Sequence, residues 1–172
     1  MMKTISILGS TGSIGRQSLD IIDNLNLTVC ALTAGTNVQR MAEQCRKYRP
    51  ALAVMATQDA AQQLMSELTD IEIEVTYGEQ GLIRAATMPQ ADCVITAVVG
   101  MIGLKPTLAA IRAGKRIGLA NKETLVAGGQ LVMKKAKEKG IYTVLSLGGG
   151  GSEPSSAFAA VTKDAEKRKI LI

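Results

Sequence analysis

The sequence predicts an α/β protein built on a doubly wound, mostly parallel sheet, and three observations support this fold class. Short β-branched runs alternate with segments of helical periodicity along the chain. Hydrophobic residues make up 47% of the sequence but aromatic residues only 2%, so aliphatic side chains and Met must fill the core, as they do around buried parallel strands. A glycine-rich turn separates the first strand from the first helix, where Rossmann-like domains hold a phosphate.

The glycine-rich turn contains Gly9, Gly12 and Gly15 in the spacing G-x-x-G-x-x-G, a variant of the dinucleotide fingerprint G-x-G-x-x-G. The run Thr4–Leu8 before it is short and β-branched, and apolar residues recur at helical spacing after it. We expect Gly9 to permit a tight turn, Gly12 to leave room for a pyrophosphate at the helix N-terminus, and Gly15 to let the helix pack closely on the strand. An ordinary strand-to-helix connection can carry the same glycines, and the position after the first strand is what favours a nucleotide.

The histidine and cysteine content restricts the available chemistry. The sequence has no histidine, which excludes Ser-His-Asp and Cys-His catalysis and the usual zinc ligand sets. Cys30, Cys45 and Cys93 lie far apart, and we interpret them as reduced core residues. Catalysis would therefore rest on Lys, carboxylate, Ser or Thr side chains, or on a bound cofactor.

The net charge of +5 is unevenly distributed, because residues 1–104 carry 7 basic and 10 acidic side chains whereas residues 105–172 carry 13 and 5. The second part should attract anions, but its basic residues are scattered and aromatic residues for base stacking are scarce, which argues against nucleic acid. The longest apolar stretch, Ala97–Leu104, is too short to cross a bilayer. We therefore expect a cytoplasmic protein without a membrane partner, whose ligands are phosphorylated small molecules.

A second strand is expected at residues 27–33, and its end informs the choice of nucleotide. NAD-selective domains usually place Asp or Glu there to accept a hydrogen bond from the ribose 2′-OH, and this sequence has neither. Gly35, Thr36 and Asn37 follow instead, with Arg40 one turn further on, so the sequence favours NADP over NAD. Asn37 is explained equally well as the N-cap of the next helix, and the two roles can coexist.

Hydrophobic periodicity and the breakers between the runs place the remaining elements. Helices are expected at residues 38–48, 57–68, 79–88 and 106–113, and after Thr124 as far as about residue 139. Strands are expected at residues 51–55, 71–77, 93–100, 115–119 and 142–147. The strand at 71–77 has acidic residues at alternate positions and should lie at an edge. The strand at 93–100 should be central and lead into a small-residue loop at the ligand crevice.

A second polar cluster, Asn121-Lys122-Glu123, follows the strand at 115–119. Amide, ammonium and carboxylate groups at the carboxyl end of a strand are costly to bury unless a partner or ligand meets them. Lys122 could bind a substrate phosphate or hydroxyl, and Asn121 and Glu123 could hydrogen-bond a nicotinamide ribose or the substrate. The alternative is a solvated helix N-terminus with Asn121 as its cap.

A family resemblance is carried by four segments: Ile7–Gly15, Ala34–Val38, Pro106–Lys115 and Leu119–Val126. Together they resemble 1-deoxy-D-xylulose 5-phosphate reductoisomerase, and the similarity extends from residue 3 to about residue 141. The resemblance implies an oxidoreductase that uses NADPH and a divalent metal, Mg²⁺ or Mn²⁺, to rearrange and reduce its substrate to 2-C-methyl-D-erythritol 4-phosphate in non-mevalonate isoprenoid biosynthesis. It implies NADPH-binding roles for Thr11, Gly12, Ser13, Ile14, Gly35, Asn37, Asn121 and Glu123. Lys122 would bind the phosphorylated sugar substrate.

Two positions depart from the family pattern. The family often has a basic residue where Thr36 stands, and the loss of a charged hydrogen bond to the 2′-phosphate would be worth about 1.5–3 kcal/mol. The family's metal-binding Asp-Ser-Glu-His-Ser stretch is matched here by Gly151-Ser152-Glu153-Pro154-Ser155, so Gly151 replaces the first acidic ligand. Glu153 is then the one predicted metal ligand, and alone it makes a poor site for Mg²⁺ or Mn²⁺.

We divide the chain into an NADPH-binding domain at residues 1–147 and a segment at 148–172 that combines a Gly-rich linker with a remnant of a catalytic domain. On this interpretation the chain binds NADPH without turnover. Two other classes stay open: another NADP-dependent dehydrogenase, of the semialdehyde or homoserine type, and a non-catalytic binding or assembly module. An unpaired strand at residues 168–172 would favour association, so a homo-oligomer is also considered.

Overall fold

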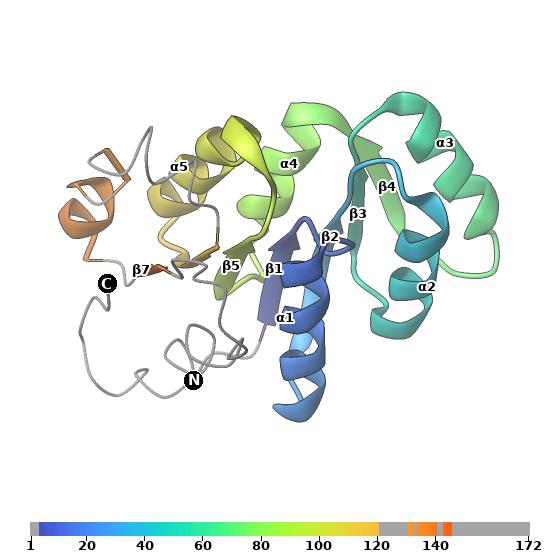
Figure 1. Ribbon diagram of the computed structural model, residues 1–172, viewed down its shortest axis with the longest axis horizontal. Helices are drawn as coiled ribbons and strands as arrows, with labels where there is room; N and C mark the ends of the chain where they lie inside the picture. Colours follow the sequence, from blue (N-terminus) through green and yellow to red (C-terminus); the bar gives the residue numbers. More distant parts are fainter. Residues whose placement is uncertain (1–3, 121–130, 133, 141–142, 146–172) are drawn as a thin grey trace.

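The computed structural model describes residues 4–120, 131–132, 134–140 and 143–145. Seven strands of this part form one sheet in the order β4-β3-β2-β1-β5-β6-β7, and every neighbouring pair is parallel (Figure 1). The strands are β1 (Thr4–Leu8), β2 (Thr28–Thr33), β3 (Leu52–Met55), β4 (Glu74–Tyr77), β5 (Cys93–Thr96), β6 (Arg116–Leu119) and β7 (Thr143–Leu145). The helices are α1 (Ser13–Asn24), α2 (Val38–Tyr48), α3 (Gln58–Glu67), α4 (Gly78–Ala86) and α5 (Leu104–Arg112), with a 3₁₀ turn η1 (Gly100–Gly103). The predicted fold class is confirmed.

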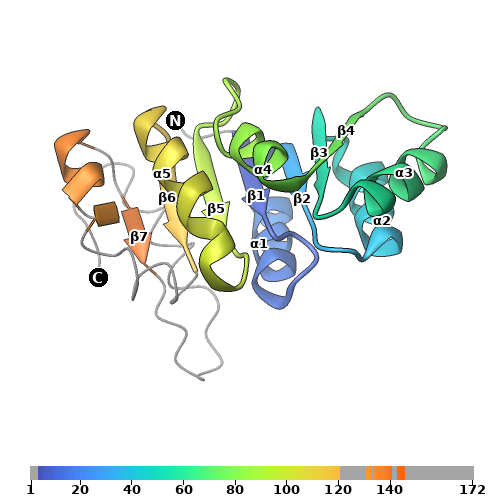
Figure 2. The ribbon, with the colours of Figure 1, turned by 90° about the horizontal axis from the view of Figure 1, so that it is seen from above.

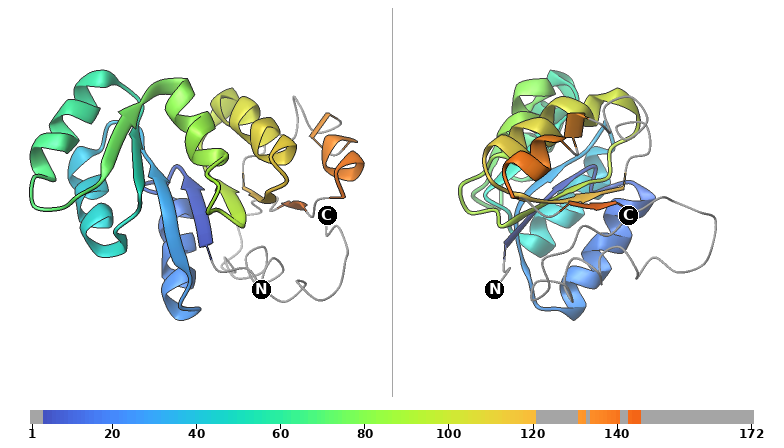
Figure 3. Two further views of the ribbon diagram at one scale, coloured as in Figure 1. Left: turned by 180° about the vertical axis from the view of Figure 1, so that it is seen from behind. Right: turned by 90° about the vertical axis from the view of Figure 1, so that its left-hand side faces the viewer.

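Helices cover both faces of the sheet (Figure 2; Figure 3, right). One apolar cluster joins α1, α2 and α3 to the sheet, and a second joins α4 and α5 to its other face. The alternation of side chains along β5 shows how one strand serves both clusters: Cys93 and Ile95 belong to the first, and Val94 to the second. A strand buried on both faces is mostly apolar, as β1 and β5 are. Their buried polar residues are hydrogen-bonded: the Ser6 hydroxyl donates to the Ala85 carbonyl oxygen at 2.7 Å, and the hydroxyls of Thr96 and Thr107 lie 3.2 Å apart.

β1 lies in the middle of the sheet, and the order of the strands reverses there. β2, β3 and β4 follow one another on one side of β1, whereas β5, β6 and β7 lie on the other. In open parallel sheets the ligand crevice lies outside the carboxyl ends of the strands at such a switch point. The ends of β1, β2 and β5, at Leu8, Thr33 and Thr96, therefore define where a ligand should be sought.

Two ends of the observed strands lie three or four residues inside the predicted ends. β4 lies at the edge of the sheet as predicted, but it begins at Glu74 and not at residue 71. The reason is that the neighbouring strand β3 begins at Leu52, which pairs with Glu74. β5 is central as predicted, but it ends at Thr96, which pairs with Leu8 and Leu119. β1 turns away at Gly9, so the chain after Thr96 has no ladder to continue, and it forms η1 where a loop was predicted.

The cysteines are all buried free thiols, as predicted. Burial raises the pKa of the thiol from 9.0 to about 11 for Cys30 and to about 12 for Cys45 and Cys93. A raised thiol pKa means that folding favours the protonated form. This contribution to stability is therefore complete below pH 9 and is lost as the pH rises toward 11 to 12.

The folded chain should resist thiol reagents. At pH 8 we expect none of the three cysteines to react with dithionitrobenzoate on the timescale of minutes, and all three to react once guanidinium unfolds the chain. The absorbance of released thionitrobenzoate measures this directly. Rapid reaction of even one thiol without denaturant would contradict the burial of these side chains.

None of the helices in the described part of the chain is both long and apolar enough to span a membrane.

Candidate nucleotide-binding site

Backbone hydrogen bonds fix the turn between β1 and α1 to the end of β2. The Gly9 N–H donates to Thr33, to its carbonyl oxygen at 3.1 Å and to its hydroxyl oxygen at 2.9 Å, and the Ser10 N–H donates to the same carbonyl at 2.8 Å. Gly9 has a φ of +88°, in the left-handed region that favours glycine. A Cβ at Gly9 would also lie 2.8 Å from the carbonyl oxygen of Ala97. The predicted tight turn is confirmed.

Gly15 and Gly12 differ in how closely the backbone of this turn packs against them. A Cβ at Gly15 would lie 2.2 Å from the carbonyl oxygen of Gly9 and 2.6 Å from the Cα of Ser10, so the first turn of α1 packs directly on the backbone after β1. A Cβ at Gly12 would meet only the Gly9 carbonyl oxygen, at an ordinary 3.5 Å. The fold therefore needs glycine at position 15 but leaves the outer side of position 12 open, where the pyrophosphate is expected.

A buried polar pair ties the turn to α2. The Ser10 hydroxyl donates to Oε1 of Gln44 at 2.6 Å, and Nε2 of Gln44 donates to the Ser10 carbonyl oxygen at 3.0 Å. Ser10 is fully buried and Gln44 is 8% exposed, so these groups have little access to water. Buried polar groups that satisfy each other hold a specific geometry. The pair therefore sets the position of the turn relative to α2.

The N-terminus of α1 is open to a ligand. Gly12 is its N-cap residue and has no side chain to occupy the first N–H groups of the helix. Of the predicted nucleotide-binding residues beside it, Ser13 and Ile14 are exposed and Thr11 is half-buried. An uncapped helix N-terminus with exposed neighbours is suited to an anion such as a pyrophosphate.

A cavity of about 270 Å³ lies beside the turn, at the carboxyl ends of the strands. It joins the glycine turn to the ends of β2 and β3, to α4 and to the segment after β5. Its lining residues are Gly9, Thr11, Gly12, Thr33, Ala34, Gly35, Met55, Ala56, Leu82, Ala97, Val98, Val99 and Ile102. The glycines form one wall and aliphatic side chains most of the rest, an arrangement that suits a planar base and a sugar next to a phosphate.

The end of β2 carries no carboxylate. Asn37 caps α2, because its Oδ1 accepts a hydrogen bond from the Arg40 N–H at 3.1 Å. The capping role predicted for Asn37 is therefore confirmed. Gly35 and Thr36 are exposed beside it, and nothing in the described chain lies within 4 Å of a Cβ at Gly35. This end of the site has room for a ribose and its substituents.

A family model described as 1-deoxy-D-xylulose 5-phosphate reductoisomerase matches residues 5–129. The chain belongs to this family. The matched residues include the glycine turn, all the residues that line the cavity and the Asn-Lys-Glu cluster. The family resemblance that the four sequence segments indicated is confirmed.

The similarity to individual reductoisomerases is high but covers only part of them. The reductoisomerase of Symbiobacterium thermophilum is 53% identical over 147 residues, which are 82% of this chain and 38% of that relative. A solved reductoisomerase from Zymomonas mobilis in complex with NADPH is 40% identical with a TM-score of 0.78, and the alignment covers 83% of this chain and 38% of that one. A solved DOX-P reductoisomerase in complex with NADPH, fosmidomycin and magnesium is 38% identical with a TM-score of 0.78, covering 83% and 36%. The chain thus spans well under half the length of these relatives.

The structure brings part of the predicted reductoisomerase site together. Four predicted residues line the cavity: Gly9, Thr11, Gly12 and Gly35. Four others stand at the adjoining helix N-termini: Ser13, Ile14, Thr36 and Asn37. The remaining predicted residues lie outside the described residues: Asn121, Lys122, Glu123 and Glu153.

The described residues do not form a metal site. No group of three or more His, Cys, Asp or Glu side chains among them could hold a metal ion. Glu153 is not among these residues, and Gly151 stands two positions before it where the family has an acidic ligand. Mg²⁺ and Mn²⁺ prefer several oxygen ligands, and the described residues do not supply such a set.

Sequence reasoning missed the apolar wall of the cavity. Ala56, Leu82, Val98 and Ile102 line it, and Val99 beside them is 84% exposed. The expectation that the segment after the central strand faces the crevice pointed to this region without naming side chains. The sequence alone carried no signal for these side chains, because the exposure of Val99 beside the cavity is seen only in the structure.

Proposed function

We propose that this chain is the cofactor-binding part of a 1-deoxy-D-xylulose 5-phosphate reductoisomerase and that it binds NADPH. The observation that carries the proposal is the glycine turn at the uncapped N-terminus of α1, open on its outer side beside a cavity with glycine and aliphatic walls. Family membership and the NADPH complex of a 40% identical relative support it.

Different residues would contact different parts of the cofactor. Thr11, Gly12 and the first N–H groups of α1 would hold the pyrophosphate, and the aliphatic wall with Val98 and Ile102 would hold the adenine. Gly35 leaves space for the adenosine ribose. Bound NADPH supplies the hydride of the family's reduction, while the turn and the cavity position the cofactor and exclude water from part of it.

For the 172-residue chain we propose NADPH binding without turnover. The support is chemical: Gly151 removes an acidic ligand, and Glu153 alone makes a poor divalent-metal site. In the family, Lys122 would contact the phosphorylated substrate, and Asn121 and Glu123 would contact the cofactor. Cytoplasmic location and self-association remain proposals, the latter tested by light scattering with and without NADPH.

Titration of the purified chain with NADPH and with NADH tests the function. The chain has no Trp, so nicotinamide fluorescence can be read without interference from protein emission. We expect NADPH to bind at least about tenfold more tightly than NADH, a difference of about 1.4 kcal/mol. Binding of neither nucleotide would overturn the proposal.

A second arm of the same experiment adds Mn²⁺ and 1-deoxy-D-xylulose 5-phosphate to the NADPH-saturated chain. We expect no loss of absorbance at the nicotinamide band above a blank without protein. A relative spanning the whole enzyme serves as the positive control. Measurable product would contradict the proposed lack of turnover while leaving NADPH binding supported.

A further inference from the structure

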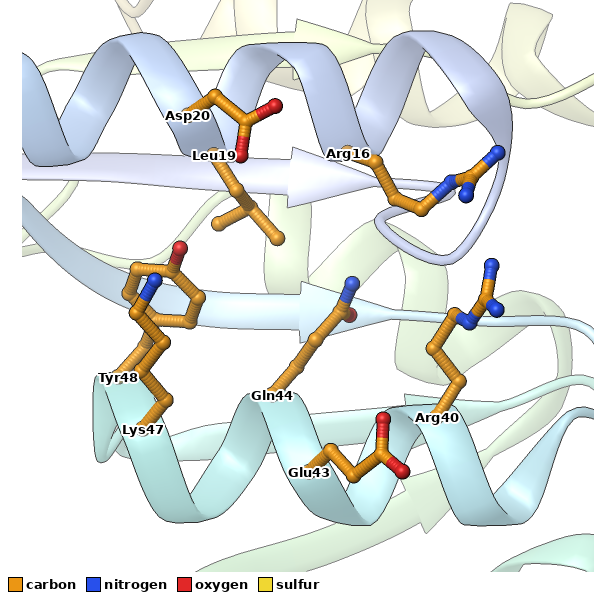
Figure 4. Close-up of a pocket in the computed structure, with 8 residues that line it drawn as sticks. All are labelled: Arg16, Leu19, Asp20, Arg40, Glu43, Gln44, Lys47 and Tyr48. Carbon is orange, nitrogen blue, oxygen red and sulfur yellow. The ribbon is translucent and has the colours of Figure 1, made fainter.

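A second groove, of about 440 Å³, runs between α1 and α2 (Figure 4). We call it the α1–α2 groove. Its lining residues are Arg16, Leu19, Asp20, Arg40, Glu43, Gln44, Lys47 and Tyr48. Gln44 also holds the glycine turn through its hydrogen bonds to Ser10, so the groove lies next to the nucleotide site.

Arg16 and Arg40 lie opposite each other at one end of this groove. Figure 4 shows their side chains reaching from α1 and α2 toward the end to which the neighbouring strand arrows point, which is the ligand side of the sheet. Nε of Arg16 donates to the carbonyl oxygen of Gly12 at 3.4 Å, so this side chain leans over the glycine turn. Arg40 follows the cap residue Asn37, whose Oδ1 accepts from its backbone N–H.

Within the described chain neither Arg16 nor Arg40 forms an ion pair. Arg46 and Arg84, by contrast, pair with Asp70 and Glu74. Two guanidinium groups that face each other repel, and an anion between them removes the repulsion. Their planar donors match the oxygens of a phosphate, which can accept from both at once.

The other groups facing the groove do not cancel this charge. Lys47, at the far end, donates to Oδ2 of Asp23 at 2.5 Å, so its charge is already paired. Asp20 and Glu43 lie one turn further along their helices than the two arginines, and neither is within ion-pair distance of them in the described chain. Within the described chain, the guanidinium donors other than Nε of Arg16 are therefore available to a ligand at the strand end of the groove.

We infer that Arg16 and Arg40 bind the 2′-phosphate of NADPH and set the preference for NADP over NAD. This inference rests on the proposed function. Thr36 supplies no charge at the position where the family often has a basic residue, and β2 ends without a carboxylate that would repel a phosphate. Arg40 lies in the helix that begins there, and Arg16 leans over the glycine turn from the first turn of α1, so the two would contact the 2′ substituent from both sides.

Nucleotide titrations of Arg16→Gln, Arg40→Gln and the double variant test the inference. Each single substitution should weaken NADPH binding about tenfold, because one charged hydrogen-bonding partner is lost, and NADH binding should change by less than about twofold. Competition with 2′,5′-ADP should weaken in parallel, and competition with ADP should not. The preference for NADPH should decrease with added salt in the unmodified chain and lose most of that dependence in the double variant.

Lys47→Gln is the matched control, because it removes the same charge from the opposite end of the α1–α2 groove. It should leave the ratio of NADPH to NADH affinity unchanged. If the unmodified chain prefers NADPH and the double variant keeps that preference, the assignment of Arg16 and Arg40 is wrong and the proposed function stands. If the unmodified chain binds neither nucleotide, the proposed function fails and this inference fails with it.

Discussion

Gly15→Val should both abolish NADPH binding and lower the free energy of unfolding by about 3 kcal/mol, because overpacking at a rigid contact is relieved only by moving backbone. The added Cβ would lie 2.2 Å from the Gly9 carbonyl oxygen and 2.6 Å from the Ser10 Cα. These are main-chain atoms already fixed by hydrogen bonds to Thr33, so α1 must move away from the turn. The pyrophosphate site is made of that turn and that helix N-terminus, and it is displaced with them.

Gly12→Ala separates the two effects. Its Cβ would meet only an oxygen at 3.5 Å, and exchanging Gly for Ala at an N-cap costs about 0.5–1 kcal/mol, much less than the overpacking at Gly15. We therefore expect only a small loss of stability in urea but NADPH binding weakened by about tenfold or more, since the methyl group stands where the pyrophosphate approaches. If Gly15→Val bound NADPH normally, or if Gly12→Ala had no effect on affinity, the glycine turn would not be the phosphate site.

The sequence was sufficient to predict the elements because local pattern determines them. β1 and α2 begin and end where hydrophobic periodicity and capping residues place them, and Asn37 is the cap that its residue type favours. The two inaccurate strand ends have a different cause. Where β4 begins and β5 ends depends on how far the neighbouring strands extend, and that is decided by residues distant in the chain.

The same distinction separates the predictable from the unpredictable part of the site. The spacing of the glycines identified the turn, because Gly9 adopts a positive φ and Gly15 packs on the backbone of Gly9 and Ser10, only a few positions earlier in the chain. The tie between Ser10 and Gln44 joins positions 34 residues apart, and the approach of Arg16 to Arg40 depends on the packing of α1 against α2. No periodicity reveals either. Such contacts become visible only once the topology has placed the two helices side by side.

Gln44→Leu provides the second large effect, because it leaves buried groups without partners. The Ser10 carbonyl oxygen loses the Gln44 donor, and the Ser10 hydroxyl keeps two longer contacts, to the Thr33 carbonyl oxygen at 3.2 Å and to the Met41 sulfur at 3.8 Å. A stranded buried polar group costs about 1–3 kcal/mol, so we expect the free energy of unfolding to fall by about 2 kcal/mol. NADPH affinity should fall as well, because the turn is no longer held against α2.

A double-mutant cycle with Ser10→Ala distinguishes the pair from a general loss of packing. Ser10→Ala removes the hydroxyl but keeps the carbonyl contact with Nε2 of Gln44, so it should cost less than Gln44→Leu. If the two side chains act as a pair, the loss of unfolding free energy in the double variant should be about 1 kcal/mol smaller than the sum of the losses in the two single variants. Gln63→Leu, the same exchange at an exposed position of α3, should leave stability and affinity unchanged. Strict additivity would mean that Gln44 stabilises α2 alone and does not position the phosphate turn.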